Sequence, residues 1–377
     1  MRIALVITEL DPGGAEKCLT QLACFLASEG HAVQVYAIGP PPVAGQDHLL
    51  HELAAHQVPV EFCIAPGGLR STWSFRKVVR WLRAALKQFA PDIVQAMLFH
   101  GNLLAALAVD RRRVALFGGV RVRQPERWRW WLQRWSSRSM IKVVCVSDDV
   151  ARHCAQREGI SREKLITIPN GIDLEKVCRI ADASVDFKWT EFGLPADARV
   201  LLFVGRLHPQ KGIEELVIRA DDLLSELPQH HLVIIGNGPL ESRLRTLATA
   251  RVHLVGWQSN VVACMNRADV LLLPASYEGM PNVLLEAMAV RLPFVAFDVD
   301  GVRQLLGNSA LASKQMAASG DISQFIELTR QMTLDLRLRT ACASSNIDRV
   351  KQHFQLAQQL AAYLEMYREF GANSFRN

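Results

Sequence analysis

Two glutamates eight residues apart mark the part of this sequence best suited to chemistry. Glu278 and Glu286 lie within SYEGMPNVLLEAMA, residues 276–289, where a loop leads into a short apolar helix. Pro281 and Asn282 indicate where that helix starts, with Asn282 as the expected N-cap residue. Glu278 then falls in the loop and Glu286 about one turn inside the helix.

The position of Glu286 between apolar residues raises the question of its partner, because an unpaired buried charge is costly. A ribose diol would supply two hydrogen-bond donors of the right size. The loop amides around Gly279 and Met280, followed by the helix N-terminus, suit a phosphate or sugar hydroxyls. The alternative is that both glutamates are structural and pair with arginines.

Two cations share another loop, VGRLHPQKG, which follows an apolar run that predicts a strand. Arg206 and Lys211 could hold a diphosphate there, the first through its planar fork and the second as a point charge. The alternative is a pair of solvated loop charges. Because both lie on one loop at a strand end, we favour a phosphate site.

Three further residues follow strands in the first half of the chain. Gly13 and Gly14 precede a helix, so their backbone could approach a phosphate, although a plain tight turn is equally compatible. They lack the G-x-G-x-x-G spacing of dinucleotide binders, which disfavours a nicotinamide cofactor. His100 could transfer a proton or bind a sugar hydroxyl, or it could be an ordinary turn histidine.

Alternating strand-like and helix-like segments must position these residues. Buried strands are predicted at residues 2–8, 32–38, 92–97, 114–120 and 142–147, and again at 199–205, 231–236, 252–256, 269–274 and 292–297. Strands buried on both faces and separated by helices predict parallel sheets covered on both sides. Ligands bind beyond the carboxyl ends of such strands, so we expect two doubly wound α/β domains facing each other across a ligand cleft.

Breaks in this pattern predict the domain boundaries. We expect an N-terminal domain over residues 1–180 and a C-terminal domain over 186–353, joined by a linker in the aperiodic segment from 168 to about 186. The segment 354–377 is predicted as a C-terminal helix that returns to the first domain.

The composition of the sequence indicates the cellular compartment and the class of binding partner. Half of the 377 residues are hydrophobic, and the eight cysteines form no CxxC pair, which is typical of buried thiols in the reducing cytoplasm. We expect neither a signal peptide nor a membrane span. The first 185 residues hold 24 Lys and Arg against 17 Asp and Glu, while the rest is nearly neutral. The basic half suggests an anionic partner, but its cations match no nucleic-acid reading motif, so nucleic-acid binding is disfavoured.

The segment RVRQPERWRWWLQRWSSRSM, residues 121–140, contains four of the eight tryptophans. On a helix, Trp128, Trp131 and Trp135 share one face with arginines beside them. Such a helix could rest on an anionic membrane through residues 121–138. The alternative is that the tryptophans pack into the core of the first domain.

Taken together, these motifs resemble glycosyltransferase family 4, which has the GT-B fold. The resemblance rests on GGAE, IPNGID, VGRLHPQKG, IIGNGP, VGW, EGMPNVLLEAMA and DVDG, and it extends along essentially the whole chain. It implies a retaining, metal-independent glycosyltransferase that moves a sugar from a nucleotide diphosphate sugar to a glycan or lipid-linked acceptor. Cell-surface polysaccharide, lipopolysaccharide or glycolipid synthesis is the implied process, and a UDP-sugar is favoured over a GDP-sugar.

The resemblance also implies roles for individual residues. His100, Arg206, Lys211 and Glu278 would act at the reacting centre, the two cations by neutralising the leaving diphosphate. The implied donor-binding residues are Gly13, Gly14, Gly236, Gly238, Trp257, Gly279, Met280, Pro281, Asn282 and Glu286, with Glu286 on the ribose hydroxyls.

The sequence departs from the family pattern at two positions. Asp300 stands where a second glycine is usual, and Gln304 where a glutamate is common, which affects the expected donor choice. Asp298 and Asp300 imitate a metal-binding D-x-D, but the rest of the pattern argues against a metal there. A nucleotide-sugar 2-epimerase of similar fold and a catalytically silent sugar-nucleotide-binding scaffold remain alternatives.

Overall fold

The computed structural model describes residues 1–63, 72–123, 126–184 and 186–371. The chain divides into two compact units, which are treated separately below. Unit 1 comprises Met1–Asn170 and Gln359–Asn377, and unit 2 comprises Gly171–Gln358.

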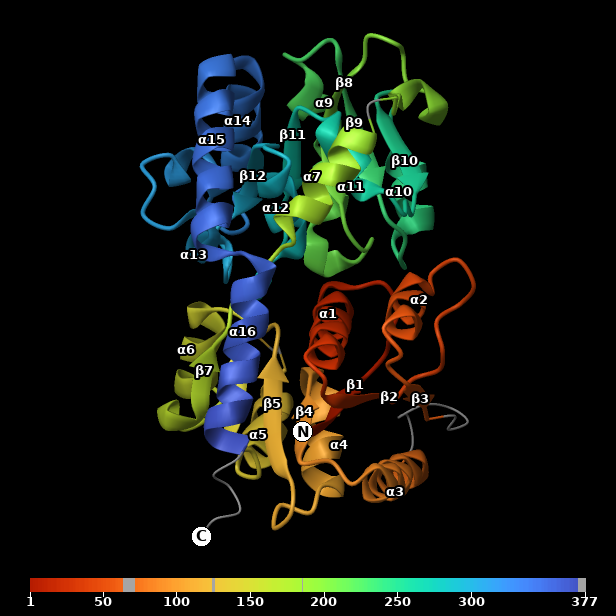
Figure 1. The fold of residues 1–377 in the computed structure, drawn as a ribbon. Helices are drawn as coiled ribbons and strands as arrows, with labels where there is room; N and C mark the ends of the chain where they lie inside the picture. The colour runs from red at the N-terminus through yellow and green to blue at the C-terminus, as the bar shows by residue number, and fades with distance from the viewer. Residues whose placement is uncertain (64–71, 124–125, 185, 372–377) are drawn as a thin grey trace. The chain divides into compact units, whose positions relative to one another are not determined.

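The core of unit 1 is a sheet which, within the described residues, has seven parallel strands in the order β3-β2-β1-β4-β5-β6-β7 (Figure 1). The strands are β1 (Arg2–Ile7), β2 (Ala32–Ala37), β3 (Val60–Phe62), β4 (Ile93–Ala96), β5 (Ala115–Val120), β6 (Lys142–Cys145) and β7 (Leu165–Thr167). Every residue of β4 and β5 is buried, as expected for central strands with helices on both faces.

Helices cover both faces of this sheet. They are α1 (Gly14–Ser28), α2 (His48–Ala55), α3 (Thr72–Phe89), α4 (Leu98–Ala108), α5 (Arg127–Ser137), α6 (Asp148–Gln156) and the 3₁₀ turn Arg162–Lys164. Helix α1 packs against α2, whereas α4 packs between α3 and α5. The helices α3, α4 and α5 therefore form one layer.

The end of the chain completes unit 1. Helix α16 (Leu356–Met366) continues into a π-helical turn, Tyr367–Gly371. The hydroxyl of Tyr367 donates to Oε1 of Gln95 in β4 at 3.1 Å, and its ring lies 5.3 Å from that of Phe117 in β5. These buried contacts anchor the C-terminal segment on the sheet.

Unit 2 is also built around a parallel sheet. In the part of the chain described, this sheet has six strands in the order β10-β9-β8-β11-β12-β13. These strands are β8 (Arg199–Val204), β9 (His230–Ile235), β10 (Val252–Gly256), β11 (Val270–Leu273), β12 (Phe294–Phe297) and β13 (Met316–Ala317). The predicted class of two doubly wound parallel α/β domains is confirmed.

The helices of unit 2 include the long pair α14 and α15, which lie side by side in Figure 1. The α-helices are α7 (Leu174–Ala183), α8 (Ile213–Ile218), α9 (Ala220–Leu224), α10 (Glu241–Leu247), α11 (Val261–Asn266), α12 (Asn282–Ala289), α13 (Val302–Leu306), α14 (Ile322–Leu334) and α15 (Leu336–His353). The 3₁₀ turns are Trp189–Phe192, Pro209–Lys211 and Ala312–Lys314. No helix among the described residues is long and apolar enough to cross a bilayer.

The expectation of an aperiodic linker from 168 to about 186 is wrong in one respect, because α7 forms within it. This helix buries only Val177 and Ala181, and Asp173 caps its start by accepting from the backbone N–H of Lys176 at 2.9 Å. Two buried residues give too weak a period to detect in the sequence.

Candidate active site

The strongest contact between predicted site residues in unit 2 joins loops that follow neighbouring strands. Lys211 ends the 3₁₀ turn after β8, and Glu278 lies in the loop between β11 and α12. Strands β8 and β11 are adjacent and parallel, so their carboxyl ends place both loops at the same edge. The ammonium of Lys211 donates to Oε1 of Glu278, and the two side chains are 19% and 11% exposed. The pair is largely withdrawn from water.

Gln210 ties the same two loops together and was not predicted. Its side-chain amide donates to the carbonyl of Tyr277 at 2.9 Å, and its own carbonyl accepts from the N–H of Ser276 at 2.8 Å. These bonds fix the backbone on either side of the Lys211–Glu278 pair. Gln210 directly precedes Lys211 in the sequence. However, no sequence pattern predicts which glutamine will form hydrogen bonds with the backbone of another loop.

Arg206 differs from Lys211 in its surroundings. It is exposed, and its side chain forms no hydrogen bond or ion pair with residues that the structure describes, although its backbone carbonyl accepts from the N–H of His208 at 2.8 Å. Nearby, burial and then the charges of Arg206 and Lys211 lower the pKa of His208. The loop after β8 therefore has a positive electrostatic potential. Of its two cations, Lys211 is paired with Glu278, whereas Arg206 is available for an anion.

Close backbone approaches shape the loops around this pair. Gly212 has φ +65°, and a Cβ there would lie 1.9 Å from the carbonyl oxygen of Pro274. Gly301 has φ +80°, and its Cβ would lie 2.1 Å from the carbonyl oxygen of Gly279. Only glycine fits these positions, which bring the loops after β8 and β12 onto the segment around Glu278.

The predicted base-flanking residues follow β9 and β10. The N–H of Gly236 donates to the carbonyl of Gly256 at 2.9 Å, which joins the two loops. Gly238 approaches Leu207 so closely that a Cβ would lie 2.5 Å from the Leu207 carbonyl oxygen. Trp257 is half-buried beside them. The loops after β8, β9 and β10 are thus held as one backbone platform.

Two expectations for the stretch 276–289 need correction. The N-cap of α12 is Pro281 with extended backbone and no side-chain cap, whereas Asn282 is already the first helical residue. Glu286 is half-buried rather than buried, although Leu285 and Ala287 beside it are buried. Its carboxylate can be partly solvated, so the inference from an unpaired buried charge does not apply. The segment Gly279–Pro281 is buried.

The departures from the family pattern lie after β12. Asp298 forms an ion pair with Arg303 of α13, and both Asp300 and Gln304 are half-buried. Among the described residues, no cluster of three or more His, Cys, Asp or Glu side chains could hold a metal ion.

In unit 1, Gly13 and Gly14 form the N-terminus of α1, directly beyond β1. Gly13 is the N-cap, and a Cβ there would lie 2.2 Å from Oε2 of Glu16. Glu16 is 7% exposed, and burial is the main cause that raises its pKa to about 7. The glycine turn thus makes room for a buried carboxyl group, a feature the sequence did not reveal.

His100 lies within helix α4, in its first helical turn after β4, and not in an irregular turn between elements. Its ring stacks edge-on against Phe99 at 5.2 Å, and burial followed by the charge of Arg129 lowers its pKa. The lowered pKa favours the neutral imidazole, which can donate or accept a hydrogen bond. Because β1 and β4 are adjacent, His100 shares an edge of the sheet with Gly13.

Each unit thus gathers its own predicted residues at the carboxyl edge of its sheet. Unit 2 brings together Arg206, Lys211, Gly236, Gly238, Trp257 and the segment 278–282, with Glu286 one turn into α12. Unit 1 brings together Gly13, Gly14 and His100.

Comparison with protein families gives two matches. Residues 12–176 match the model described as Glycosyltransferase Family 4, and residues 198–335 match Glycosyl transferases group 1. Among solved structures, that of Anabaena Alr3699/HepE in complex with UDP and glucose has a TM-score of 0.81 at 19% identity, covering 98% of this chain and 100% of that one. The lipopolysaccharide-biosynthesis glycosyltransferase WaaG has a TM-score of 0.72 at 18% identity, covering 97% and 99%.

Curated relatives of known name are also similar. The Escherichia coli UDP-Gal:alpha-D-GlcNAc-diphosphoundecaprenol alpha-1,3-galactosyltransferase is 25% identical over 64% of each chain. The Rhizobium meliloti lipopolysaccharide core biosynthesis glycosyltransferase LpsE is 27% identical over 59% of this chain and 63% of its own. The Mycolicibacterium smegmatis phosphatidyl-myo-inositol mannosyltransferase is 27% identical over 79% and 75%. The chain spans slightly less than two thirds of the length of the first two.

The two parallel sheets and these structural likenesses define a protein of the GT-B glycosyltransferase fold. With both halves matched by family models, the chain belongs to the family 4 glycosyltransferases.

Proposed function

We propose that this chain is a retaining glycosyltransferase that moves a sugar from a nucleotide diphosphate sugar to a hydroxyl acceptor. The observation that carries the proposal is the arrangement after β8, where an available Arg206 lies on the same loop as Lys211, which is paired with Glu278. Breaking the bond to the donor sugar leaves negative charge on the diphosphate. Preorganised cations at that place stabilise the charge as it develops.

The proposed roles in unit 2 follow from this assignment. Arg206 and Lys211 neutralise the diphosphate, and Glu278 orients Lys211 while it contacts the donor sugar. The buried backbone of Gly279–Pro281 lies next to Glu278 and offers amides to the sugar or phosphate. Glu286, half-buried on α12, binds the ribose hydroxyls.

A UDP-sugar is the favoured donor. Solved structures of Anabaena Alr3699/HepE contain UDP or UDP-glucose, and the name of the Escherichia coli relative gives UDP-Gal as its donor. We also propose that transfer needs no metal, since the two cations can take the charge of the leaving group. The roles of Gly13, Gly14 and His100 stay as predicted from the sequence.

A glycan or lipid-linked acceptor in surface polysaccharide, lipopolysaccharide or glycolipid assembly fits the relatives. Their names give a diphosphoundecaprenol-linked sugar, a lipopolysaccharide core and a phosphatidylinositol as their own substrates or products. We propose that the protein works in the cytoplasm, at the inner face of the plasma membrane.

Donor turnover tests this function. The protein is incubated with UDP-glucose, UDP-galactose or GDP-mannose, with and without a lipid extract of bacterial membranes, and released nucleoside diphosphate is measured. We expect UDP release from one UDP-sugar, faster with the extract, and NMR should show the product with the anomeric configuration of the donor. Release of no nucleoside diphosphate from any donor would contradict the proposal.

The same NMR experiment separates the alternatives. A 2-epimerase would convert the nucleotide sugar to a second one without an acceptor. A silent scaffold would bind the donor and neither transfer nor slowly hydrolyse it. No observation in this structure favours either.

A further inference from the structure

Helix α5 of unit 1 reverses the usual distribution of residues on a surface helix. Its polar residues Gln133, Ser136 and Ser137 are buried at 2%, 0% and 3% exposure. Both serine hydroxyls donate to carbonyls within the helix, at 2.9 and 2.8 Å. The three most deeply buried side chains of α5 are therefore polar, and both serine hydroxyls are satisfied within the helix, while the half-buried Trp130 stacks on His153 with ring centroids 5.4 Å apart.

The side that α5 turns to solvent is aromatic. Trp128, Trp131 and Trp135 are 57%, 71% and 37% exposed, and their spacing of three and four residues places them on one face. The alternative in which these tryptophans pack into the core is therefore wrong. Three large exposed indoles on one helix form a patch of the kind that marks an interaction site.

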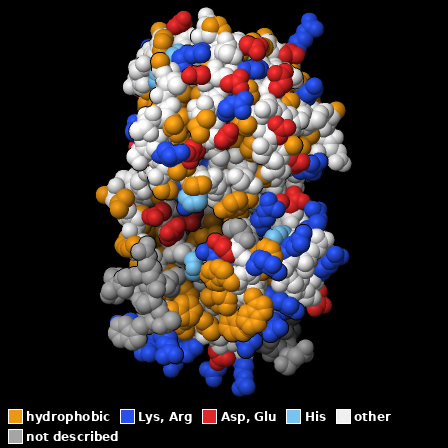
Figure 2. All heavy atoms as spheres, turned by 180° about the vertical axis from the view of Figure 1, so that it is seen from behind, with side chains coloured by type: hydrophobic (Ala, Val, Ile, Leu, Met, Phe, Trp, Pro, Cys, Tyr) orange, Lys and Arg blue, Asp and Glu red, His pale blue; other side chains and the backbone are white. Residues whose placement is uncertain are grey.

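Arginines border this patch. Arg127 and Arg134 are exposed on the same helix, and so is its C-cap residue, Arg138. The nearby acid Glu126 pairs with Arg129 at 3.4 Å. We call the three tryptophans and these three exposed arginines the α5 surface. On the face drawn in Figure 2, hydrophobic side chains gather in the lower half of the picture, with Lys and Arg around them.

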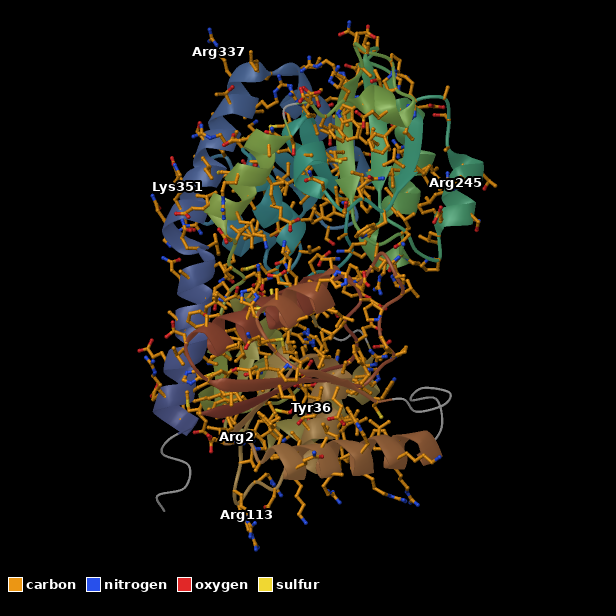
Figure 3. The ribbon with its side chains drawn as sticks, turned by 45° about the vertical axis from the view of Figure 1, so that its right-hand side comes forward. Arg2, Tyr36, Arg113, Arg245, Arg337 and Lys351 are labelled. Atoms are coloured by element: carbon orange, nitrogen blue, oxygen red, sulfur yellow. The ribbon has the colours of Figure 1, made fainter. Side chains whose placement is uncertain are left out.

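The layer beside α5 adds positive charge. Tyr36 and Trp81 help to hold the apolar side of α3 against the sheet, with ring centroids 6.1 Å apart (Figure 3). Exposed cations on the remainder of α3 are Arg76, Lys77, Arg80, Arg83 and Lys87. Residues 111–113, after α4, are three more exposed arginines. Arg113 points away from unit 1 in Figure 3, and its side chain forms an ion pair with Asp110 at 3.9 Å.

We infer that the α5 surface docks on a lipid bilayer that contains anionic lipids. Indole rings favour the boundary between headgroups and acyl chains, because one end is apolar and the other carries an N–H donor. The bordering guanidinium groups then meet lipid phosphates, which attract basic residues at the membrane surface.

Charge also favours a bilayer over a second copy of this chain. A symmetric dimer through the α5 surface would place its arginines against those of the other copy, and like charges across an interface are costly. An anionic bilayer presents the complementary sign over the whole area.

The α5 surface is connected to the predicted site of unit 1. The ring of Trp128 lies 5.8 Å from that of Phe99, and the guanidinium of Arg129 lies 5.2 Å from the same ring. Phe99 in turn stacks on His100. If the proposed function holds, docking would place His100 close to the headgroup region, where a lipid-linked acceptor presents its hydroxyl.

Vesicle co-sedimentation tests the docking without relying on activity. The purified full chain is mixed with vesicles of phosphatidylcholine alone or of phosphatidylcholine with phosphatidylglycerol. We expect binding to the anionic vesicles that weakens with salt, and little binding to the neutral ones. The double variant W131S/W135S and the double variant R127S/R138S should each lose about tenfold in partitioning.

Matched controls come from unit 2. Leu334 and Leu336 are 62% and 63% exposed, so L334S/L336S removes comparable apolar surface, and R337S/K351S removes two exposed cations. Both controls should sediment like the parent protein, and an unchanged unfolding temperature should confirm that all four variants fold. The inference is overturned if the parent does not bind anionic vesicles or if W131S/W135S binds as well as its control. It is also overturned if gel filtration shows a parent dimer that W131S/W135S converts to monomer.

Discussion

At the scale of single residues, the two cations after β8 differ in what their removal would change. Lys211 is engaged with Glu278 in a largely buried pair, whereas Arg206 is exposed and has no such partner among the described residues. Loss of Lys211 therefore affects folding and chemistry together. Loss of Arg206 isolates the chemistry.

Replacing Arg206 with alanine should slow sugar transfer by about 100-fold, because one preorganised charge next to the leaving group is lost. The free energy of unfolding should change by less than about 0.5 kcal/mol, as for other exposed side chains. Donor turnover and thermal unfolding check the two parts. Arg245→Ala is the control, since Arg245 is an exposed arginine of α10 (Figure 3) that pairs with Glu241. Equal turnover in the two variants would show that Arg206 does not act on the donor.

Replacing Lys211 with methionine should destabilise the protein by about 2 kcal/mol, because the carboxylate of Glu278 loses its partner at a site with 11% side-chain exposure. The variant Glu278→Gln should cost less, since glutamine can still accept from Lys211. The double variant should be more stable than the sum of the single effects predicts. Denaturant unfolding measures all three, and strict additivity would show that the pair does not stabilise the fold.

Glu16 predicts a pH dependence of stability. Burial raises its pKa from the usual 4.5 to about 7, so the folded state binds the proton more tightly than the unfolded state. Stability from this group is complete below about pH 4.5 and is lost as the pH rises toward 7, with a maximum loss of about 3 kcal/mol.

The variant Glu16→Gln should therefore lose less stability than the parent between pH 5 and pH 7 in thermal unfolding. A remaining decline is expected, since burial raises the pKa of Glu158 to about 7 as well. Glu29→Gln, an exposed site that follows the same helix, should behave like the parent. Parallel pH curves for all three proteins would rule out a buried, protonated Glu16.

At the scale of elements, glycines decide how closely the loops of unit 2 pack. Gly212→Ala would place its Cβ 1.9 Å from the carbonyl oxygen of Pro274 in addition to straining a φ of +65°. Gly193→Ala would face a similar φ of +80° with no heavy atom within 4 Å. The control should lose about 1 kcal/mol from the strained backbone alone, and Gly212→Ala clearly more. Equal unfolding free energies would mean that the loops after β8 and β11 do not depend on this approach.

The sequence was informative about elements where burial is deep. The central strands are continuous apolar runs, and their predicted positions agree with the structure to within a residue or two. The strands β3, β7 and β13 escaped prediction because they have two or three residues and lie at sheet edges, where no apolar run is required. Helix α7 was missed for the same physical reason, since it buries little.

The candidate site shows the same limit. Residue types and loop order could predict that Arg206, Lys211 and Glu278 follow strand ends, because parallel strands end at one edge. The ion pair between Lys211 and Glu278, the bridging by Gln210 and the buried state of Glu16 depend on distances across the fold. A linear pattern contains none of those distances.

At the scale of the whole molecule, the chain repeats one architecture and varies its surface. Each unit places its polar residues at the carboxyl edge of a parallel sheet, but the charge is uneven. Unit 1 carries the basic helices and the α5 surface, and unit 2 carries the platform of loops proposed to hold the donor. This division fits the proposed function, in which one substrate is a soluble nucleotide sugar and the other is bound to a surface.

The central claim is that unit 2 binds a nucleotide diphosphate through Arg206 and Lys211, and thermal unfolding with UDP, GDP, ADP and uridine tests it most directly. A ligand that binds only the folded protein raises its unfolding temperature. We predict that UDP clearly raises the unfolding temperature, that GDP and ADP raise it less, and that uridine does not raise it. We also predict that UDP raises the unfolding temperature of Arg206→Ala much less than that of Arg245→Ala. No rise with any nucleoside diphosphate, or the same rise in both variants, would contradict the account.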